Sequence, residues 1–186
     1  MSFWPGPFIR KNHMSKKSLA KMLRVNQAGE YGAKRIYAGQ LAVLKRRRAA
    51  PETIEKITHM AAQEQAHLDK FNSMVAANQV RPTALQPIWH VAGFALGAVT
   101  AMMGEKAAMA CTVAVEEVID EHYAQQSEQL HDQPELKKVV DQFRDEENEH
   151  RMTALESGAE QALGYPILRK LIRAGSKTAI WIAERV

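Results

Sequence analysis

The chain has 186 residues, of which 46% are hydrophobic and 25% are charged, so it is expected to form one domain, or one domain with an appendage, rather than a disordered protein. Its one cysteine, Cys111, excludes an internal disulfide and a thiolate metal cage within one chain. The formal net charge of +4 conceals +11 over residues 1–48, −11 over residues 49–163 and +4 over residues 164–186. This asymmetry indicates an anionic partner, either a membrane surface or a nucleic acid.

The N-terminal segment, residues 1–20, is basic and has no long apolar run with a cleavage site. We therefore expect no secretory signal and a reducing, cytoplasm-like compartment. From there on the pattern predicts an all-α protein, because apolar/polar alternation and β-branched runs are scarce. The predicted helices cover, in chain order, residues 16–47, 52–78, 89–130 (a break near Gly104 is left open), 135–160 and 166–184.

Several residues are typical of helix ends. Ser15 is expected to cap the helix at 16–47, and Pro51 suits the first turn of the next helix. Asp132 with Pro134 is expected to open the helix at 135–160. Residues 88–103 carry no charge and are somewhat short for a spanning helix, which needs about 20 residues. A buried core helix and a membrane-facing helix are equally compatible with this segment.

Two Glu-x-x-His units suggest chemistry. They are Glu64 with His67 and Glu147 with His150. At positions i and i+3 of a helix, a carboxylate and an imidazole lie on one face and can reach one ion. A single such pair in a Glu-rich helix is usually solvated, but two pairs on two predicted helices point to a metal site.

Each pair has a candidate partner carboxylate upstream. Glu30 precedes Glu64 by 34 residues, and Glu116 precedes Glu147 by 31 residues. The midpoints of these two intervals fall at residue 47 and between residues 131 and 132, where the sequence predicts turns. Each lone glutamate would therefore face a Glu-x-x-His unit across a helical hairpin, and the two hairpins would be an internal duplication.

Two such hairpins would pack into a four-helix bundle with four glutamates and two histidines pointing inward. This is the ligand set of ferritin-like di-iron or di-manganese carboxylate proteins, and it suits iron or manganese better than zinc. The six candidate ligands are Glu30, Glu64, His67, Glu116, Glu147 and His150. Cations would also explain how four carboxylates can be buried together.

Two further residues share a face with Glu116. Asp120 lies at i+4 and is a candidate acceptor that could orient a histidine. Tyr123 lies at i+7 and is interpreted either as a residue lining the site or, more simply, as a core aromatic. Glu117, Glu146 and Glu149 are turned away from the ligand positions and are expected to be solvated or to lie behind the ligands.

Five segments resemble the 5-demethoxyubiquinone hydroxylases of ubiquinone biosynthesis. They read RVNQAGEYGAKRIYAGQ (24–40), QEQAHLDKF (63–71), RPTALQPIWHVAGFALGA (81–98), ACTVAVEEVIDEHY (110–123) and FRDEENEHR (143–151). The resemblance covers about residues 20–186, so we expect a ferritin-like di-iron domain over residues 21–186 after the basic segment 1–20. A C-terminal amphipathic helix completes the expected fold.

The resemblance implies a monooxygenase that uses O2 to hydroxylate the ring of a prenylated demethoxyubiquinol. It implies two iron ions, bridged by Glu64 and Glu147, the two residues to which we assign the catalytic role. Glu30 and His67 would bind one iron, and Glu116 and His150 the other. His122 and Tyr123 match a His-Tyr pair that the family keeps near its quinone channel. The resemblance also implies NADH as the electron source, although the chain has no Gly-x-Gly-x-x-Gly motif.

The apolar segment 88–103 and the basic, amphipathic helix at 166–184 suit a membrane interface, where the basic side chains would meet anionic head groups. We therefore expect a peripheral protein on the cytoplasmic face of a bacterial inner membrane. The family also suggests an accessory protein of the same pathway, and a homo-oligomer is left open. The alternative is a ferritin- or rubrerythrin-like protein that oxidises iron or scavenges peroxide. Nucleic-acid binding through residues 10–48 has no motif to support it.

Overall fold

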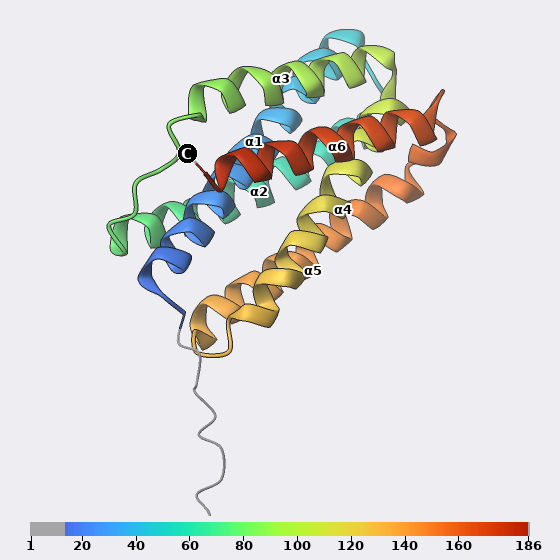
Figure 1. Cartoon of the computed structure of the whole chain (residues 1–186). Helices are drawn as coiled ribbons and strands as arrows, with labels where there is room; N and C mark the ends of the chain where they lie inside the picture. The colour runs from blue at the N-terminus through green and yellow to red at the C-terminus, as the bar shows by residue number, and fades with distance from the viewer. Residues whose placement is uncertain (1–13, 186) are drawn as a thin grey trace, which may run out of the picture.

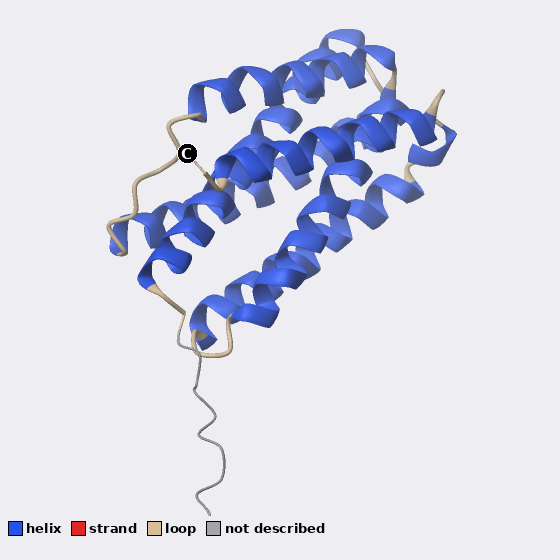
Figure 2. Ribbon diagram, viewed as in Figure 1, coloured by secondary structure: helices blue, strands red, loops and turns tan. Residues whose placement is uncertain are grey.

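The computed structural model describes residues 14–185, which are almost entirely helical and contain no strand within that range (Figure 2). The elements are α1 (Lys16–Arg47), α2 (Pro51–Ala77), α3 (Gln86–Met103), α4 (Glu105–Gln129), α5 (Pro134–Glu156), a short 3-10 helix η1 (Ala159–Gln161) and α6 (Tyr165–Ala183). Residues 1–13 of the expected basic segment lie outside the described residues. The expected domain boundary after residue 20 falls inside α1.

Helices α1, α2, α4 and α5 form a bundle of two hairpins, with α1 packed on α2 and α4 packed on α5 (Figure 1). The turns lie between Arg47 and Pro51 and between Gln129 and Pro134. The midpoint calculated for the second hairpin lies within its turn, and that for the first hairpin is Arg47, the last residue of α1. The predicted two-hairpin bundle is therefore confirmed. Apolar side chains from the hairpins fill the bundle on either side of its middle, with Phe71 and Ile57 fully buried.

Two of the three residues expected at helix ends have the expected role. The Ser15 hydroxyl accepts a hydrogen bond of 3.1 Å from the backbone N–H of Ser18, and Pro51 occupies the first turn of α2. The expectation for Asp132 is wrong, because Gln133 precedes α5 without a side-chain cap. The Asp132 carboxylate instead accepts a hydrogen bond of 2.8 Å from the backbone N–H of Met14.

The long helix predicted at 89–130 is two helices. Gly104 has a φ of 125°, a conformation that glycine alone adopts without strain, and it separates α3 from α4. Helix α3 lies along α1 on the outside of the bundle (Figure 1). Only Gly97, Thr100 and Ala101 of α3 are buried, so the alternative of a buried core helix is wrong.

The C-terminal helix α6 is amphipathic, as predicted, and it packs on α4. Its basic side chains hold it there: Arg169 and Arg173 pair with Glu117 at 2.7 and 2.6 Å. Lys177 and Arg173 also pair with Glu121. Acids of α4 therefore pair with these three cations in the described structure, and the expectation that basic residues of α6 meet lipid head groups stays a prediction. Within residues 14–185, no helix combines the length and the apolar character needed to cross a membrane.

Candidate metal centre

The four bundle helices bring the six predicted ligands together in the middle of the bundle. Helix α1 contributes Glu30 and α4 contributes Glu116, while each of α2 and α5 contributes a Glu-x-x-His unit. All six side chains are at most 2% exposed; they are Glu30, Glu64, His67, Glu116, Glu147 and His150. Burial of four carboxylates without a compensating cation would be unfavourable.

The six residues form two overlapping groups, each able to surround one ion. The first group contains Glu30, Glu64, His67 and Glu147, and the second contains Glu64, Glu116, Glu147 and His150. Within each group the candidate ligand atoms lie within 4.8 Å of one another. Only the two glutamates of the Glu-x-x-His units belong to both groups, which is the position of a carboxylate that bridges two ions.

His67 presents one ring nitrogen to the cluster and the other to a neighbouring acid. Its Nδ1 lies 3.0 Å from Glu147 Oε1, and its Nε2 lies 2.6 Å from Glu146 Oε2. The ring also stacks on Phe143, with a centroid separation of 3.9 Å. If Nε2 carries the proton and donates to Glu146, the lone pair of Nδ1 is directed at the cluster, as a metal ligand requires.

His150 has the equivalent arrangement in the other group. Its Nδ1 lies 3.0 Å from Glu147 Oε2, and its Nε2 lies 3.0 Å from the amide oxygen of Gln63. Gln63 and Glu146 therefore orient the two histidines from outside the cluster. The expectation that Asp120 does so is wrong, because Asp120 pairs with Arg144 at 2.7 Å.

The electrostatics of the cluster favour a bound cation. Burial, together with the charges of Glu147 and its neighbours, raises the pKa of Glu64 and of Glu116 well above the ordinary carboxyl value. Both oxygens of Glu64 and one oxygen each of Glu30 and Glu116 are buried without a hydrogen-bond partner. Hard cations such as iron or manganese would supply the missing partners, so the donor set fits a two-metal site.

His67 already performs part of this neutralisation when no metal is bound. Burial alone would lower the pKa of His67, but hydrogen bonds to Glu147 and Glu30 outweigh it and raise the pKa to about 11. Burial would likewise raise the pKa of Glu147, but His150 and His67 lower it to about 2. In the metal-free protein these shifts favour a protonated His67 beside an ionised Glu147.

Two tyrosines complete the cluster. Tyr37 donates a hydrogen bond of 2.8 Å to Glu116, and Tyr123 donates one to Glu30. Tyr123 therefore contacts the site rather than serving only as a core aromatic. The sequence interpretation missed Tyr37, although it lies 86 positions before Tyr123, the same offset that separates Glu30 from Glu116. Applying the duplication to Tyr123 would have found it.

His122 lies apart from the cluster. Its Nε2 is 2.6 Å from the amide nitrogen of Gln126, which forms two hydrogen bonds with the amide of Asn26. Gln126 donates to His122 in this arrangement, and burial lowers the pKa of the imidazole, so the neutral ring is favoured. The His-Tyr pair is thus divided between two environments, an amide network and the carboxylate cluster.

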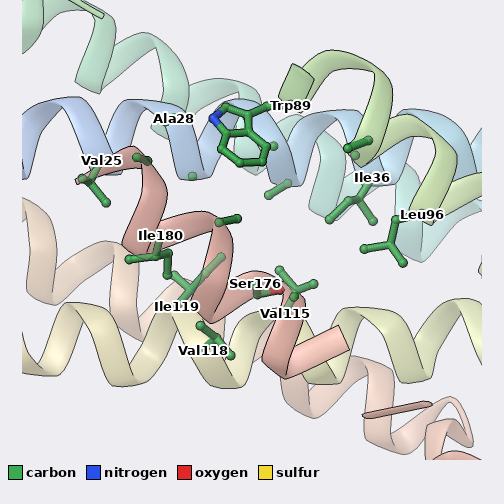
Figure 3. Close-up of a pocket in the computed structure, with 18 residues that line it drawn as sticks. Val25, Ala28, Ile36, Trp89, Leu96, Val115, Val118, Ile119, Ser176 and Ile180 are labelled. Carbon is green, nitrogen blue, oxygen red and sulfur yellow. The ribbon is translucent and has the colours of Figure 1, made fainter. Parts of the chain in front are cut away.

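An apolar cavity of about 300 Å³ lies between α1, α3, α4 and α6 (Figure 3). Labelled side chains that line it include Val25, Ile36, Trp89, Leu96, Val115 and Ile180. The cavity follows the stretches of α1 and α4 that carry Glu30 and Glu116, because Gly29 and Val115, their sequence neighbours, also line it. Neither His122 nor Tyr123 belongs to its lining.

Comparison with known proteins identifies similar chains. A family model described as "Ubiquinone biosynthesis protein COQ7" matches residues 17–183. A Rhodospirillum rubrum protein named 3-demethoxyubiquinol 3-hydroxylase is 56% identical over 89% of this chain and 77% of its own length. A Rattus norvegicus protein named NADPH-dependent 3-demethoxyubiquinone 3-hydroxylase, mitochondrial, is 50% identical over 94% of this chain and 81% of its own. A Saccharomyces cerevisiae protein named 5-demethoxyubiquinone hydroxylase, mitochondrial, is 39% identical over 90% and 78%.

Proposed function

The chain belongs to the COQ7 family of ubiquinone biosynthesis proteins, and from this membership we infer that it is a 3-demethoxyubiquinol 3-hydroxylase. Its reaction adds one oxygen atom from O2 to the ring of a prenylated demethoxyubiquinol, 2-polyprenyl-3-methyl-6-methoxy-1,4-benzoquinol. The observation that supports this most directly is the pair of overlapping ligand groups that share Glu64 and Glu147, because a two-metal carboxylate site suits oxygen chemistry.

We propose that the six buried residues hold two iron ions. Glu30 and His67 would bind one ion, Glu116 and His150 the other, and Glu64 with Glu147 would bridge them. When bound, the iron pair would supply the reduction of O2 and the oxidation of the substrate ring. The fit of the donor set is supported by the unpartnered oxygens of Glu64 and by the directed Nδ1 atoms of the two histidines.

The remaining residues position and shield this site. With metal bound, Glu146 and Gln63 would accept from Nε2 of His67 and of His150, which leaves each Nδ1 free of a proton and able to bind an ion. Tyr37 donates to Glu116 and limits the rotation of that carboxylate. The nearly complete burial of the cluster excludes bulk water, which protects a reactive oxidant from side reactions.

We assign the apolar cavity to the prenylated quinol. Its lining matches a hydrocarbon chain, and it follows the segments of α1 and α4 that carry two of the ligands. Helices α3 and α6 both line the cavity, and both expose large apolar side chains; these are Ile88, Val91, Val99, Met102 and Met103 on α3, and Ile167, Leu171 and Trp181 on α6. We propose that this apolar surface rests on a membrane, from which the substrate enters. For this chain the surface proposed is the cytoplasmic face of a bacterial inner membrane.

The electrons would come from a reduced nicotinamide nucleotide. The resemblance implied NADH, whereas the name of the rat relative specifies NADPH. Both nucleotides therefore belong in the assay of the iron-loaded protein with a short-chain demethoxyubiquinol analogue and oxygen-18. A product heavier by one labelled oxygen atom would establish the hydroxylase. Loading with two irons per chain but no oxygenated product would favour the iron-oxidising or peroxide-scavenging alternative. Glu147→Ala, which removes a residue common to both ligand groups, is the negative control.

A further inference from the structure

The glycines of the described chain fall into three groups with different physical reasons. Three lie at helix ends with φ between 71° and 125°, where a side chain would be strained; they are Gly104, Gly158 and Gly164. Three others lie where α1 and α3 touch, and a Cβ atom there would collide with the facing backbone or with Arg35; they are Gly39, Gly93 and Gly97. Backbone geometry and helix packing account for these six.

The last three glycines have neither reason. Gly29 and Gly32 lie inside α1, and Gly175 lies inside α6, each with ordinary helical geometry. A Cβ atom added at any of them would meet nothing within 4 Å. Glycine in a helix interior is less favourable than alanine, so the fold by itself would be better served by a side chain at each position.

All three of these glycines line the apolar cavity. A side chain at any of them would therefore occupy the cavity or its mouth instead of contacting the protein. The cavity wall also contains an unsatisfied donor, because Nε1 of Trp89 is buried without a hydrogen-bond partner among the described residues. Both features are unfavourable for the empty protein. The space beside the glycines becomes useful when a ligand fills it, and the indole N–H is satisfied only by a ligand that places a hydrogen-bond acceptor beside it.

We propose that Gly29, Gly32 and Gly175 set the width of the cavity and make it selective for the branched prenyl chain of the substrate. The inference rests on the proposed function, because it assigns the cavity to the quinol. A prenyl chain carries a methyl branch on every fourth carbon, so it is wider than a straight acyl chain. Because glycine has no side chain, Gly29 and Gly32 on α1 and Gly175 on α6 leave that extra width in the cavity.

The test compares two substrates in the iron-loaded enzyme: a demethoxyubiquinol without a side chain and one with three isoprene units. The variants are Gly32→Ala, Gly32→Leu, Gly175→Ala and Gly175→Leu. The ratio of kcat/KM for the prenylated over the unprenylated substrate is expected to fall several-fold with Ala and at least 10-fold with Leu. A mutation that only disturbed the metal centre would lower both rates and leave the ratio constant.

Thermal stability provides a second readout, which should rise in the Ala variants while their preference for the prenylated substrate falls. Each Gly→Ala change is expected to raise the Tm by about 1–3 °C, because alanine favours the helix and meets no obstacle. Gly39→Ala is expected to lower the Tm instead, because its Cβ would collide with the backbone of α3. Ala62→Leu, at an exposed position of α2 outside the cavity lining, is the matched control and should leave the substrate ratio unchanged.

Binding separates this inference from the proposed function. Equilibrium binding of the oxidised prenylated quinone can be followed by quenching of tryptophan fluorescence, since Trp89 lines the cavity. If the wild-type protein binds the quinone without hydroxylating the quinol, and the Leu variants lose binding, the glycine inference stands and the proposed function fails. If the wild type hydroxylates the quinol and the Gly32→Leu and Gly175→Leu variants keep its substrate ratio and quinone affinity, the glycine inference is overturned. If the Leu variants lose affinity for a straight-chain quinone as much as for the prenylated quinone, the proposed selectivity for a branched chain is overturned.

Discussion

Tyr37 of α1 donates a hydrogen bond of 2.8 Å to Glu116 of α4, 79 positions away in the chain. The duplicated pair repeats the contact in reverse, because Tyr123 of α4 donates to Glu30 of α1. Each hairpin thus supplies the tyrosine that holds the lone glutamate of the other hairpin. The two halves of the site are therefore linked by side-chain hydrogen bonds as well as by the shared carboxylates.

Removal of the Tyr37 hydroxyl should weaken metal binding. In Tyr37→Phe, one oxygen of Glu116 loses its donor in a fully buried position, so the carboxylate is less well oriented. We expect about a 10-fold loss of iron affinity, measured by competition with a chelator, with the helical circular dichroism unchanged. Tyr31→Phe, which removes an exposed hydroxyl bonded to His90, should not change the affinity. An unchanged affinity in Tyr37→Phe would contradict this role.

Replacing Glu64 with glutamine should have opposite effects with and without metal. Burial and the charge of Glu147 raise the pKa of Glu64 above its ordinary value of 4.5. The folded metal-free protein therefore binds this proton more tightly than the unfolded chain does. The protonated Glu64 carboxyl therefore contributes to the free energy of unfolding at low pH, and this contribution is lost as the pH rises above 4.5.

Thermal unfolding of metal-free protein should reveal this difference. At pH 7 we expect Glu64→Gln to melt a few degrees above the wild type, and the gap should narrow toward pH 5. With iron the order should reverse, because the variant lacks a ligand common to both groups. A metal-free variant that melts below the wild type at pH 7 would show that Glu64 ionises there at little cost.

Glu146 should influence the metal through His67. Its carboxylate accepts from Nε2 of His67 at 2.6 Å and is not a member of either ligand group. In Glu146→Gln the acceptor loses its charge, so the imidazole becomes a weaker ligand, and we expect a loss of iron affinity of about 10-fold or more. Glu149→Gln changes an exposed acid on the same helix and is the control. Equal affinities in the two variants would exclude this role of Glu146.

The exposed apolar residues of α6 should determine binding to lipid. Leu171 is 66% exposed and Trp181 is 56% exposed, and burial of such side chains in an interface favours membrane association. We expect Leu171→Asp to reduce co-sedimentation with phospholipid vesicles at least several-fold. Met152→Asp, at an apolar position of α5 that is 44% exposed, should have little effect. Equal losses in both variants would argue against α6 as the membrane-binding helix.

The sequence predicted most of the fold because the bundle is built from local signals. The bounds of α1 agree at both ends, and the calculated midpoints fall at or within one residue of the observed turns, because helix periodicity and proline act over a few residues. The sequence does not predict whether the helix breaks at Gly104, because a glycine within a helical pattern is compatible with either continuation or a stop. The packing of α3 along α1 is compatible only with a break, and this packing joins residues that are distant in the chain.

Roles that depend on contacts between helices were harder to predict. Asp120 shares a helix face with Glu116, yet Arg144 of α5 takes up its charge. The basic residues of α6 suggested lipid head groups, but Glu117 and Glu121 of α4 lie within ion-pair distance. Charge and spacing along one helix do not reveal which opposite charge the neighbouring helix presents.

The sequence is sufficient to predict most of the helices, the duplication and the six candidate ligands, because the i, i+3 spacing and the equal distances from a turn are properties of one chain segment or one hairpin. The resemblance already implied Glu64 and Glu147 as the shared carboxylates, and the two ligand groups agree with it. The hydrogen bond from Tyr37 to Glu116 and the contacts of Glu146 and Gln63 with the histidines required the three-dimensional structure. These relationships depend on the rotation and depth at which one hairpin packs against the other. That packing is set by the sum of many contacts across the bundle core, and no short segment of sequence contains it.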